Sequence, residues 1–226
     1  MKIILLILLL LPSSILIGQS RYENYLELSK GILLKKDSLQ NAYNLASLTG
    51  KDSVIDNTRE FLLSIVGNDI FSYWYGTPWD FNGHTKIPQQ GTIACGYFVT
   101  TVLLDAGFNV PRIKWAQSAS EVFIKKLAPG NLQRFSNKPI SEIEKYLRHA
   151  GPGLYVVGLD NHVGFIIVKR DSMAFVHANY YEPDIGVMSQ EIDSDNPLKN
   201  SKYRVIGKLF TDEMIIKWLH NVAYNE

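Results

Sequence analysis

QQGTIACGYFVTTVLLDAGF, residues 89–108, holds the only cysteine of this 226-residue chain, Cys95. After Cys95 the apolar residues recur at steps of one, three and four, and Gly107 follows as a stop signal. This spacing predicts a helix that begins at Cys95, although the β-branched residues between Val99 and Val102 would also suit a strand. A helix N-terminus favours a thiolate through its dipole and its unpaired N–H groups, so we expect the pKa of Cys95 to lie below about 8.5. The alternative is a small buried hydrophobic residue, as most free cysteines are.

The first 18 residues, MKIILLILLLLPSSILIG, follow the plan of a secretory signal peptide. Their apolar run is shorter than the roughly 20 residues that span a bilayer, although an uncleaved anchor remains an alternative. We expect export to the periplasm or the medium, with cleavage near Gly18 and no membrane span afterwards. No cysteine lies there to carry a lipid anchor. A lone thiol in an oxidising compartment is a hazard unless it is buried or used, which favours a catalytic role for Cys95.

Composition excludes several classes of function. The 23 basic and 22 acidic residues leave a formal net charge of +1, so there is no electrostatic case for nucleic acid or an anionic membrane as a partner. The five histidines are scattered singly, without an HExxH helix or a CxxC pair, and we expect no metal or other cofactor. The chain is long enough for one good core or for a core with a small helical appendage, and we expect a monomer.

Residues 19–70 are predicted to form an N-terminal helical arm. An interrupted helix reaches Gly50, and a second helix, capped by Asp52 or Ser53, ends at Gly67. The main domain then spans residues 71–226. Its first stretch, residues 71–83, is rich in aromatic residues, glycine and proline, and it would form either a lid over the core or a wall of a substrate cleft.

Helices come first and strands later in the main domain, which is typical of an α+β fold with helices packed on one face of a small antiparallel sheet. Two capping boxes open helices that end near Leu127 and Gly151, namely Ser118 with Glu121 and Ser141 with Glu144. Apolar runs and period-two patterns predict four strands, at residues 154–159, 162–168, 174–178 and 203–210. Thr211 would cap a last helix to about Val222.

Two histidines lie in neighbouring predicted strands, His162 at the start of one and His177 in the next. If the turn centres after Arg170, Gly164 pairs with His177, and the two imidazoles lie diagonally on one face, about 7 Å apart at the backbone. A three-residue loop would put them on opposite faces. A thiolate needs a base, and the base needs a partner that fixes its tautomer, so Cys95, His162 and His177 can fill these three roles. Alternatively, both histidines merely pack or face solvent.

The order of these motifs resembles the NlpC type of papain-like cysteine peptidases, which are bacterial cell-wall hydrolases. The resemblance covers residues 71–180 and rests on IACGYFVTTVLLDAGFNVPR around Cys95, on HVGFIIV from His162 and on FVHA around His177. It implies a papain-like fold, with Cys95 as the nucleophile, His162 as general base and then acid, and His177 as the residue that orients His162. It also implies hydrolysis of the γ-D-glutamyl to diamino acid bond of a peptidoglycan stem peptide.

The sequence departs from the family pattern beside the nucleophile. The family has Asp-Cys-Ser-Gly, whereas this chain has Ala94-Cys95-Gly96-Tyr97, and the upstream aromatic-glycine motif from Tyr73 to Gly76 lies about twenty residues before the cysteine. Both departures border the substrate cleft. They leave two alternatives, a thiol amidase or acyl transferase that acts on another substrate, and a non-catalytic cell-wall binding protein.

An oxyanion hole needs a second donor besides the Cys95 N–H. Gln89 lies six residues before Cys95, the spacing of the oxyanion glutamine in papain, and Gln90 or Tyr75 could serve instead. The sequence therefore predicts an exported thiol hydrolase with a Cys-His-His site that cleaves an amide bond.

Overall fold

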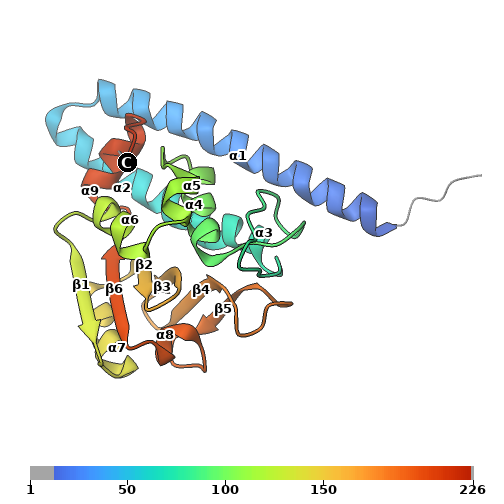
Figure 1. The fold of residues 1–226 in the computed structure, drawn as a ribbon. Helices are drawn as coiled ribbons and strands as arrows, with labels where there is room; N and C mark the ends of the chain where they lie inside the picture. Colours follow the sequence, from blue (N-terminus) through green and yellow to red (C-terminus); the bar gives the residue numbers. More distant parts are fainter. Residues whose placement is uncertain (1–12, 225–226) are drawn as a thin grey trace, which may run out of the picture.

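The structure is a computed structural model that describes residues 13–224. Residues 1–12, which hold most of the predicted signal peptide, lie outside the described residues. Within the described part of the chain, no helix is long and apolar enough to cross a membrane. Figure 1 shows a group of helices above a sheet, with the long first helix lying along the side of that group that faces away from the sheet.

Within residues 13–224, six strands form one sheet in the order β1-β6-β2-β3-β4-β5, and every neighbouring pair is antiparallel. The strands are β1 (Leu132–Ser136), β2 (Gly153–Leu159), β3 (Val163–Val168), β4 (Met173–Ala178), β5 (Val187–Glu191) and β6 (Tyr203–Lys208). The predicted meander is confirmed as β2, β3 and β4, and the predicted later strand is β6. The sequence does not predict β1 and β5, because both are short edge strands that carry mostly polar residues.

Helices cover both faces of the sheet. They are α1 (Ser13–Leu45), α2 (Leu48–Ser64), the π-helical η1 (Ile65–Ile70), α3 (Phe71–Trp74), α4 (Cys95–Asp105), α5 (Arg112–Ala116), α6 (Ser120–Leu127), α7 (Ile140–Ala150), α8 (Pro197–Asn200) and α9 (Asp212–Leu219). On one face Val156 and Phe165 share a core with α4 and α6. On the other face Ile166 belongs to a second core with Ile143 of α7. The α+β class is confirmed, whereas the prediction that helices pack on one face is wrong, because the apolar stripe of α7 is buried against the second face.

The helix predicted from Cys95 is α4, and it is a central element of the larger core. Phe98, Val102 and Leu103 on this helix are almost completely buried. Gly107 ends the helical segment with a φ of +87°, a left-handed conformation that glycine adopts without strain. The helix therefore holds Cys95 on a rigid, buried element.

The N-terminal region is not an appendage, because α1 is one uninterrupted helix that packs on the main domain. Tyr25, Ile32, Leu39 and Tyr43 recur at helical spacing and are buried in the same core as α4. The region predicted as an arm, residues 19–70, thus contributes to the core that positions α4 (Figure 1).

Two predicted boundaries of the following helix are wrong. α2 begins at Leu48, where the Ser47 side chain accepts a hydrogen bond from the N–H of Gly50, so the cap is neither Asp52 nor Ser53. At the other end the helix continues past Gly67 as η1 and then α3. Burial of the apolar side chains along this segment, Leu62, Val66, Ile70 and Phe71, outweighs the roughly 1 kcal/mol by which glycine disfavours a helix.

The two predicted capping boxes do not form. α6 begins at Ser120 without a side-chain cap, and the hydroxyl of Ser118 donates to the Trp115 carbonyl. α7 begins at Ile140, again without a side-chain cap. The cap of α9 is confirmed, since the Thr211 side chain accepts a hydrogen bond from the N–H of Met214.

Candidate active site

Cys95 is the first residue of α4, and no capping side chain occupies the N–H groups of that first turn. Gly96 lets the neighbouring α5 approach closely: a Cβ at this position would lie 2.4 Å from the carbonyl oxygen of Ala116. The close packing leaves the thiol only partly exposed.

Burial raises the pKa of the Cys95 thiol in this structure. The N–H groups of Val163, Gly96 and Cys95 itself favour the thiolate, but their effect is smaller than that of burial. The predicted lowering of this pKa is therefore wrong for the resting site, because the sulfur is largely cut off from water. A neighbouring base that takes the proton would favour ionisation of Cys95 near neutral pH.

The two histidines lie as the predicted register requires. β3 and β4 pair Phe165 with Val176, and continuing this register sets Gly164 opposite His177. Nε2 of His162 lies 2.9 Å from Nδ1 of His177. A Cβ on Gly164 would lie 2.9 Å from the Cβ of His177, so the glycine leaves the space that the second imidazole needs.

Nδ1 of His162 is buried and has no hydrogen-bond partner. Burial and the neighbouring His177 lower the pKa of His162 well below its usual value. Burial also lowers the pKa of His177 to about 4, and its Nε2 lies 2.9 Å from Oε1 of Gln190 on β5. Both rings are therefore neutral near pH 7, and a neutral imidazole has one nitrogen that can accept a proton.

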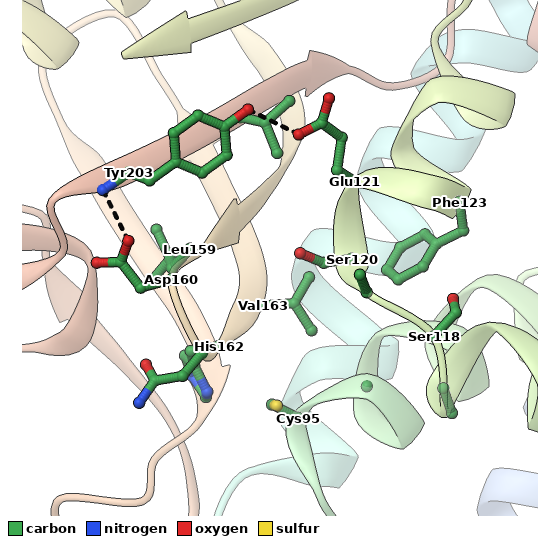
Figure 2. A pocket seen from close by; sticks show the side chains of 15 residues that line it. Cys95, Ser118, Ser120, Glu121, Phe123, Leu159, Asp160, His162, Val163 and Tyr203 are labelled. Carbon is green, nitrogen blue, oxygen red and sulfur yellow. Dashed lines mark hydrogen bonds between the residues drawn. The ribbon is translucent and has the colours of Figure 1, made fainter. Parts of the chain in front are cut away.

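Cys95 and His162 lie at the junction of two hollows. One has a volume of about 550 Å³ and the other about 840 Å³, and both are lined by this pair. Figure 2 shows the two side chains on facing walls of the smaller hollow, Cys95 on α4 and His162 directly before β3. Cys95 and His162, whose Nδ1 is buried and unpartnered, therefore line the same hollows.

The smaller hollow also contains two carboxylates, Glu121 and Asp160, and both are engaged. The Tyr203 hydroxyl donates to Glu121 over 2.7 Å, and the Tyr203 N–H donates to Asp160 over 3.1 Å (Figure 2). Hydrogen bonds from Tyr203, Arg134 and Lys125 lower the pKa of Glu121 to about 2. These carboxylates are therefore fixed anions near neutral pH and unsuited to act as general acids.

The larger hollow has an aromatic wall, which includes Trp79 and Phe81 from the loop that follows α3, together with Tyr180 after β4. The Tyr180 ring lies 5.1 Å from the His162 ring between centroids and 6.0 Å from that of Trp79. Of the two predicted roles for residues 71–83, the structure agrees with a cleft wall from Trp79 onward.

Arg112 fastens this wall to α4. Its guanidinium donates to the Thr101 hydroxyl over 2.7 Å and to the carbonyls of His84 and Thr85 over 3.0 and 2.9 Å. Because Arg112 is almost completely buried, these bonds hold the loop firmly against the helix that carries Cys95.

The three residues proposed for the oxyanion hole do not line either hollow at Cys95. The side-chain nitrogen of Gln89 donates to the carbonyl oxygen of Tyr75 over 2.7 Å, which holds the loop instead. Gln90 is exposed in the same loop. Asn161 lines both hollows, next to His162, and is the side-chain amide best placed to bind a substrate there.

Sequence reasoning also missed Tyr180 and Gln190. A signal for Tyr180 was its place three residues after His177, where the strand ends and its side chain can turn toward His162. Gln190 could be found only by recognising β5, whose pairing with β4 sets Gln190 opposite Phe175.

None of the family models, curated proteins or solved structures compared with this chain matches it. Within residues 13–224, no group of three or more His, Cys, Asp or Glu side chains is placed to hold a metal ion.

Proposed function

We propose that this protein is a thiol hydrolase that cleaves an amide bond with Cys95 as nucleophile and His162 as base. The observation that carries the proposal is the unpartnered Nδ1 of His162, buried at the same cleft as the thiol. A buried nitrogen without a partner costs about 1–3 kcal/mol, so its retention beside a nucleophile favours a role in the reaction.

The reaction would proceed through an acyl-enzyme. The S–H bond of Cys95 breaks, its proton passes to Nδ1 of His162, and the sulfur bonds to the carbonyl carbon of the substrate. The carbonyl oxygen takes the negative charge and is stabilised by N–H groups at the start of α4. His162 then gives its proton to the leaving amine as the C–N bond breaks. His162 then takes a proton from water, whose oxygen bonds to the thioester carbon. The C–S bond breaks, the carboxylic acid is released, and His162 returns its proton to the sulfur to restore the thiol.

The pKa shifts agree with this order of events. Burial raises the pKa of Cys95 and lowers that of His162, so both favour a neutral pair at rest. The ion pair then forms as substrate is attacked, which is how a general base acts on a weakly acidic nucleophile.

The cleft suggests a substrate that extends on both sides of the scissile bond, because hollows lie to either side of Cys95. The sequence resemblance implies a peptidoglycan stem peptide and a papain-like fold, and the signal-peptide pattern of residues 1–18 implies export. We retain all three as parts of this proposal. The carboxylates of the smaller hollow, Glu121 and Asp160, give this side of the cleft a negative charge, which favours a substrate with a cationic group there.

The test is hydrolysis of purified muropeptides by wild-type protein and by Cys95→Ala. We expect the variant to lose turnover while its melting temperature stays within a few degrees. Wild-type activity in Cys95→Ala would refute the assignment of the nucleophile.

A thiol amidase or acyl transferase with another substrate is the second candidate, and the aromatic wall favours it. Trp79, Phe81 and Tyr180 present stacking surfaces that a short stem peptide would leave largely unused. An acyl-enzyme that forms with aromatic or long-chain acyl amides, but not with muropeptides, would support this alternative. The product distinguishes the two reactions, because a transferase passes the acyl group to an amine instead of to water.

A further inference from the structure

Three side chains form a hydrogen-bonded series that leads from the cleft to the edge strand β5. Nε2 of His162 lies 2.9 Å from Nδ1 of His177, and Nε2 of His177 lies 2.9 Å from Oε1 of Gln190. The Phe175 ring stacks on His177 with centroids 4.2 Å apart and an interplanar angle of 18°, which fixes the plane of that imidazole. Each link therefore has a defined direction.

The contact between His177 and Gln190, at the outer end of the series, determines which ring nitrogens carry hydrogens. The amide oxygen of Gln190 only accepts, so Nε2 of His177 must carry a hydrogen. A neutral imidazole carries one ring hydrogen, which leaves the lone pair of His177 on Nδ1. That atom must then accept from Nε2 of His162. The lone pair of His162 is left on Nδ1, the buried atom without a partner.

We propose that Gln190 is a positioning residue that, through His177, holds His162 in the one neutral tautomer able to take the proton of Cys95. Its catalytic consequence rests on the proposed function of Cys95, whereas the tautomers themselves do not. When the S–H bond breaks and the proton reaches Nδ1, the imidazolium of His162 still donates from Nε2 to His177, so no other bond in the series has to change.

If the hydrogen bonds of the series ran in the opposite direction, His162 could not take the proton of Cys95 and the reaction would stop. If the amide of Gln190 turned its NH₂ toward His177, His177 would donate from Nδ1, and His162 would present an N–H to the thiol. A doubly protonated His177 would have the same effect on His162. The titratable groups that face this pair are Cys95 from α4 and Tyr180 after β4.

Two substitutions at Gln190 separate these effects. Gln190→Leu removes the acceptor, so both tautomers of His177 become accessible. Gln190→Glu keeps an acceptor and cannot present an NH₂, but its carboxylate favours the doubly protonated His177. Glu191→Gln is the matched control, because Glu191 is the exposed next residue of the same strand.

The experiment measures the histidine tautomers by long-range ¹H–¹⁵N correlation NMR, together with the rate of Cys95 alkylation by iodoacetamide across pH. In the wild type and in Glu191→Gln we expect hydrogen on Nε2 of both rings. Gln190→Leu should show mixed tautomers and label more slowly at pH 7 in proportion to the lost fraction of the competent tautomer, about twofold for an equal mixture. Gln190→Glu should keep the wild-type rate at pH 8, with the acid limb of its profile shifted upward by about one pH unit.

A hydrogen on Nδ1 of His162 in the wild type would overturn the proposal, as would unchanged tautomers and labelling in Gln190→Leu. If Gln190→Leu fails to fold, an unshifted acid limb in Gln190→Glu would overturn it equally. The expected tautomers in a protein that hydrolyses no amide would support the role of Gln190 and refute the proposed function, so the two failures are distinguishable.

Discussion

The two ends of α4 both carry polar groups in buried surroundings, but they differ in how those groups are satisfied. At its C-terminal end, the hydroxyl of Tyr25 donates to the Asp105 carboxylate and accepts from Nε1 of Trp74 over 2.9 Å. At its N-terminal end, Cys95 lies at a cleft with a ring nitrogen of His162 that has no partner.

The difference separates a fully hydrogen-bonded network from one that contains an unpartnered buried atom. The Tyr25–Asp105–Trp74 cluster, which we call the α1 anchor, joins α1 to α4 with donor and acceptor matched, as expected of a structural network. The Cys95–His162–His177–Gln190 group, which we call the cleft series, has hydrogen bonds that join His162, His177 and Gln190, whereas Nδ1 of His162 has no partner. A buried network in which one nitrogen lacks a partner is consistent with a site that binds a substrate or accepts a proton.

The largest expected difference is in the rate of Cys95 alkylation, between variants that lack one residue of each network. His162→Ala should slow alkylation of Cys95 at pH 7 by at least about 100-fold, because a general base typically contributes about 10²–10⁴-fold. Asp105→Asn at the other end of α4 should change the rate by less than about twofold. Equal effects of the two variants would mean that the ends of the helix are not functionally distinct.

Two glycines give the next contrast, in packing. Gly164→Ala would place a methyl group 2.6 Å from the Phe175 ring and 2.9 Å from the Cβ of His177, so we expect a loss of about 3 kcal/mol in the free energy of unfolding and slower alkylation. Gly31→Ala is the control, since Gly31 lies within α1 with nothing within 4 Å of its added Cβ, and it should gain about 0.5–1 kcal/mol. Urea denaturation measures both. A neutral Gly164→Ala would contradict the tight pairing of β3 with β4.

The α1 anchor should affect stability without affecting the thiol. Tyr25→Phe leaves the Asp105 carboxylate and the Trp74 N–H without this shared partner, which should cost about 2 kcal/mol. Tyr22→Phe on the same helix is the matched control and should stay within about 0.5 kcal/mol. Chemical denaturation and iodoacetamide labelling are the two measurements. A large change in labelling by Tyr25→Phe would mean that the two ends of α4 are coupled.

The smallest expected effect concerns the pH dependence of the free energy of unfolding, to which His177 and Asp105 contribute with opposite signs. Burial lowers the pKa of His177 to about 4, so its stabilising contribution is present above the unfolded value of about 6.5 and is lost as the pH falls toward 4. Burial raises the pKa of Asp105 to about 6, so its contribution is present in acid and is lost as the pH rises through 6.

Asp105→Asn removes the opposing contribution. The free energy of unfolding should then fall more steeply than in the wild type between pH 6.5 and pH 4.5, by at most about 1.4 kcal/mol per pH unit. Urea titrations at a series of pH values measure the slope. Identical slopes in the two proteins would argue that Asp105 is not protonated in the folded state.

The sequence alone predicts the features that depend on local periodicity or on whether a turn contains an even or an odd number of residues. The apolar spacing after Cys95 predicts α4, and a turn of even length between β3 and β4 brings His162 and His177 to one face. Three residues of the cleft series, Cys95, His162 and His177, could therefore be identified without a structure.

The features that the sequence does not predict depend on distant contacts. Glu121 has the spacing of a capping box, yet its carboxylate binds Arg134 and Tyr203, which come from β1 and β6. Gln190 lies on an edge strand that has too few apolar residues to be recognised. The spacing between Gln89 and Cys95 matches that of the oxyanion glutamine in papain, but the loop that holds Gln89 directs its side chain toward Tyr75. In each case the partner is fixed by the assembled sheet or loop and not by neighbouring residues.

The close approach of α5 to Gly96 has a consequence for which residues position 96 can accept. Any residue with a side chain there would place its Cβ 2.4 Å from the Ala116 carbonyl oxygen. Position 96 can therefore gain a side chain only if the helix from Arg112 to Ala116 retreats. We expect the two segments to covary during evolution, with glycine at 96 accompanying a short helix held close and a larger residue accompanying a displaced one.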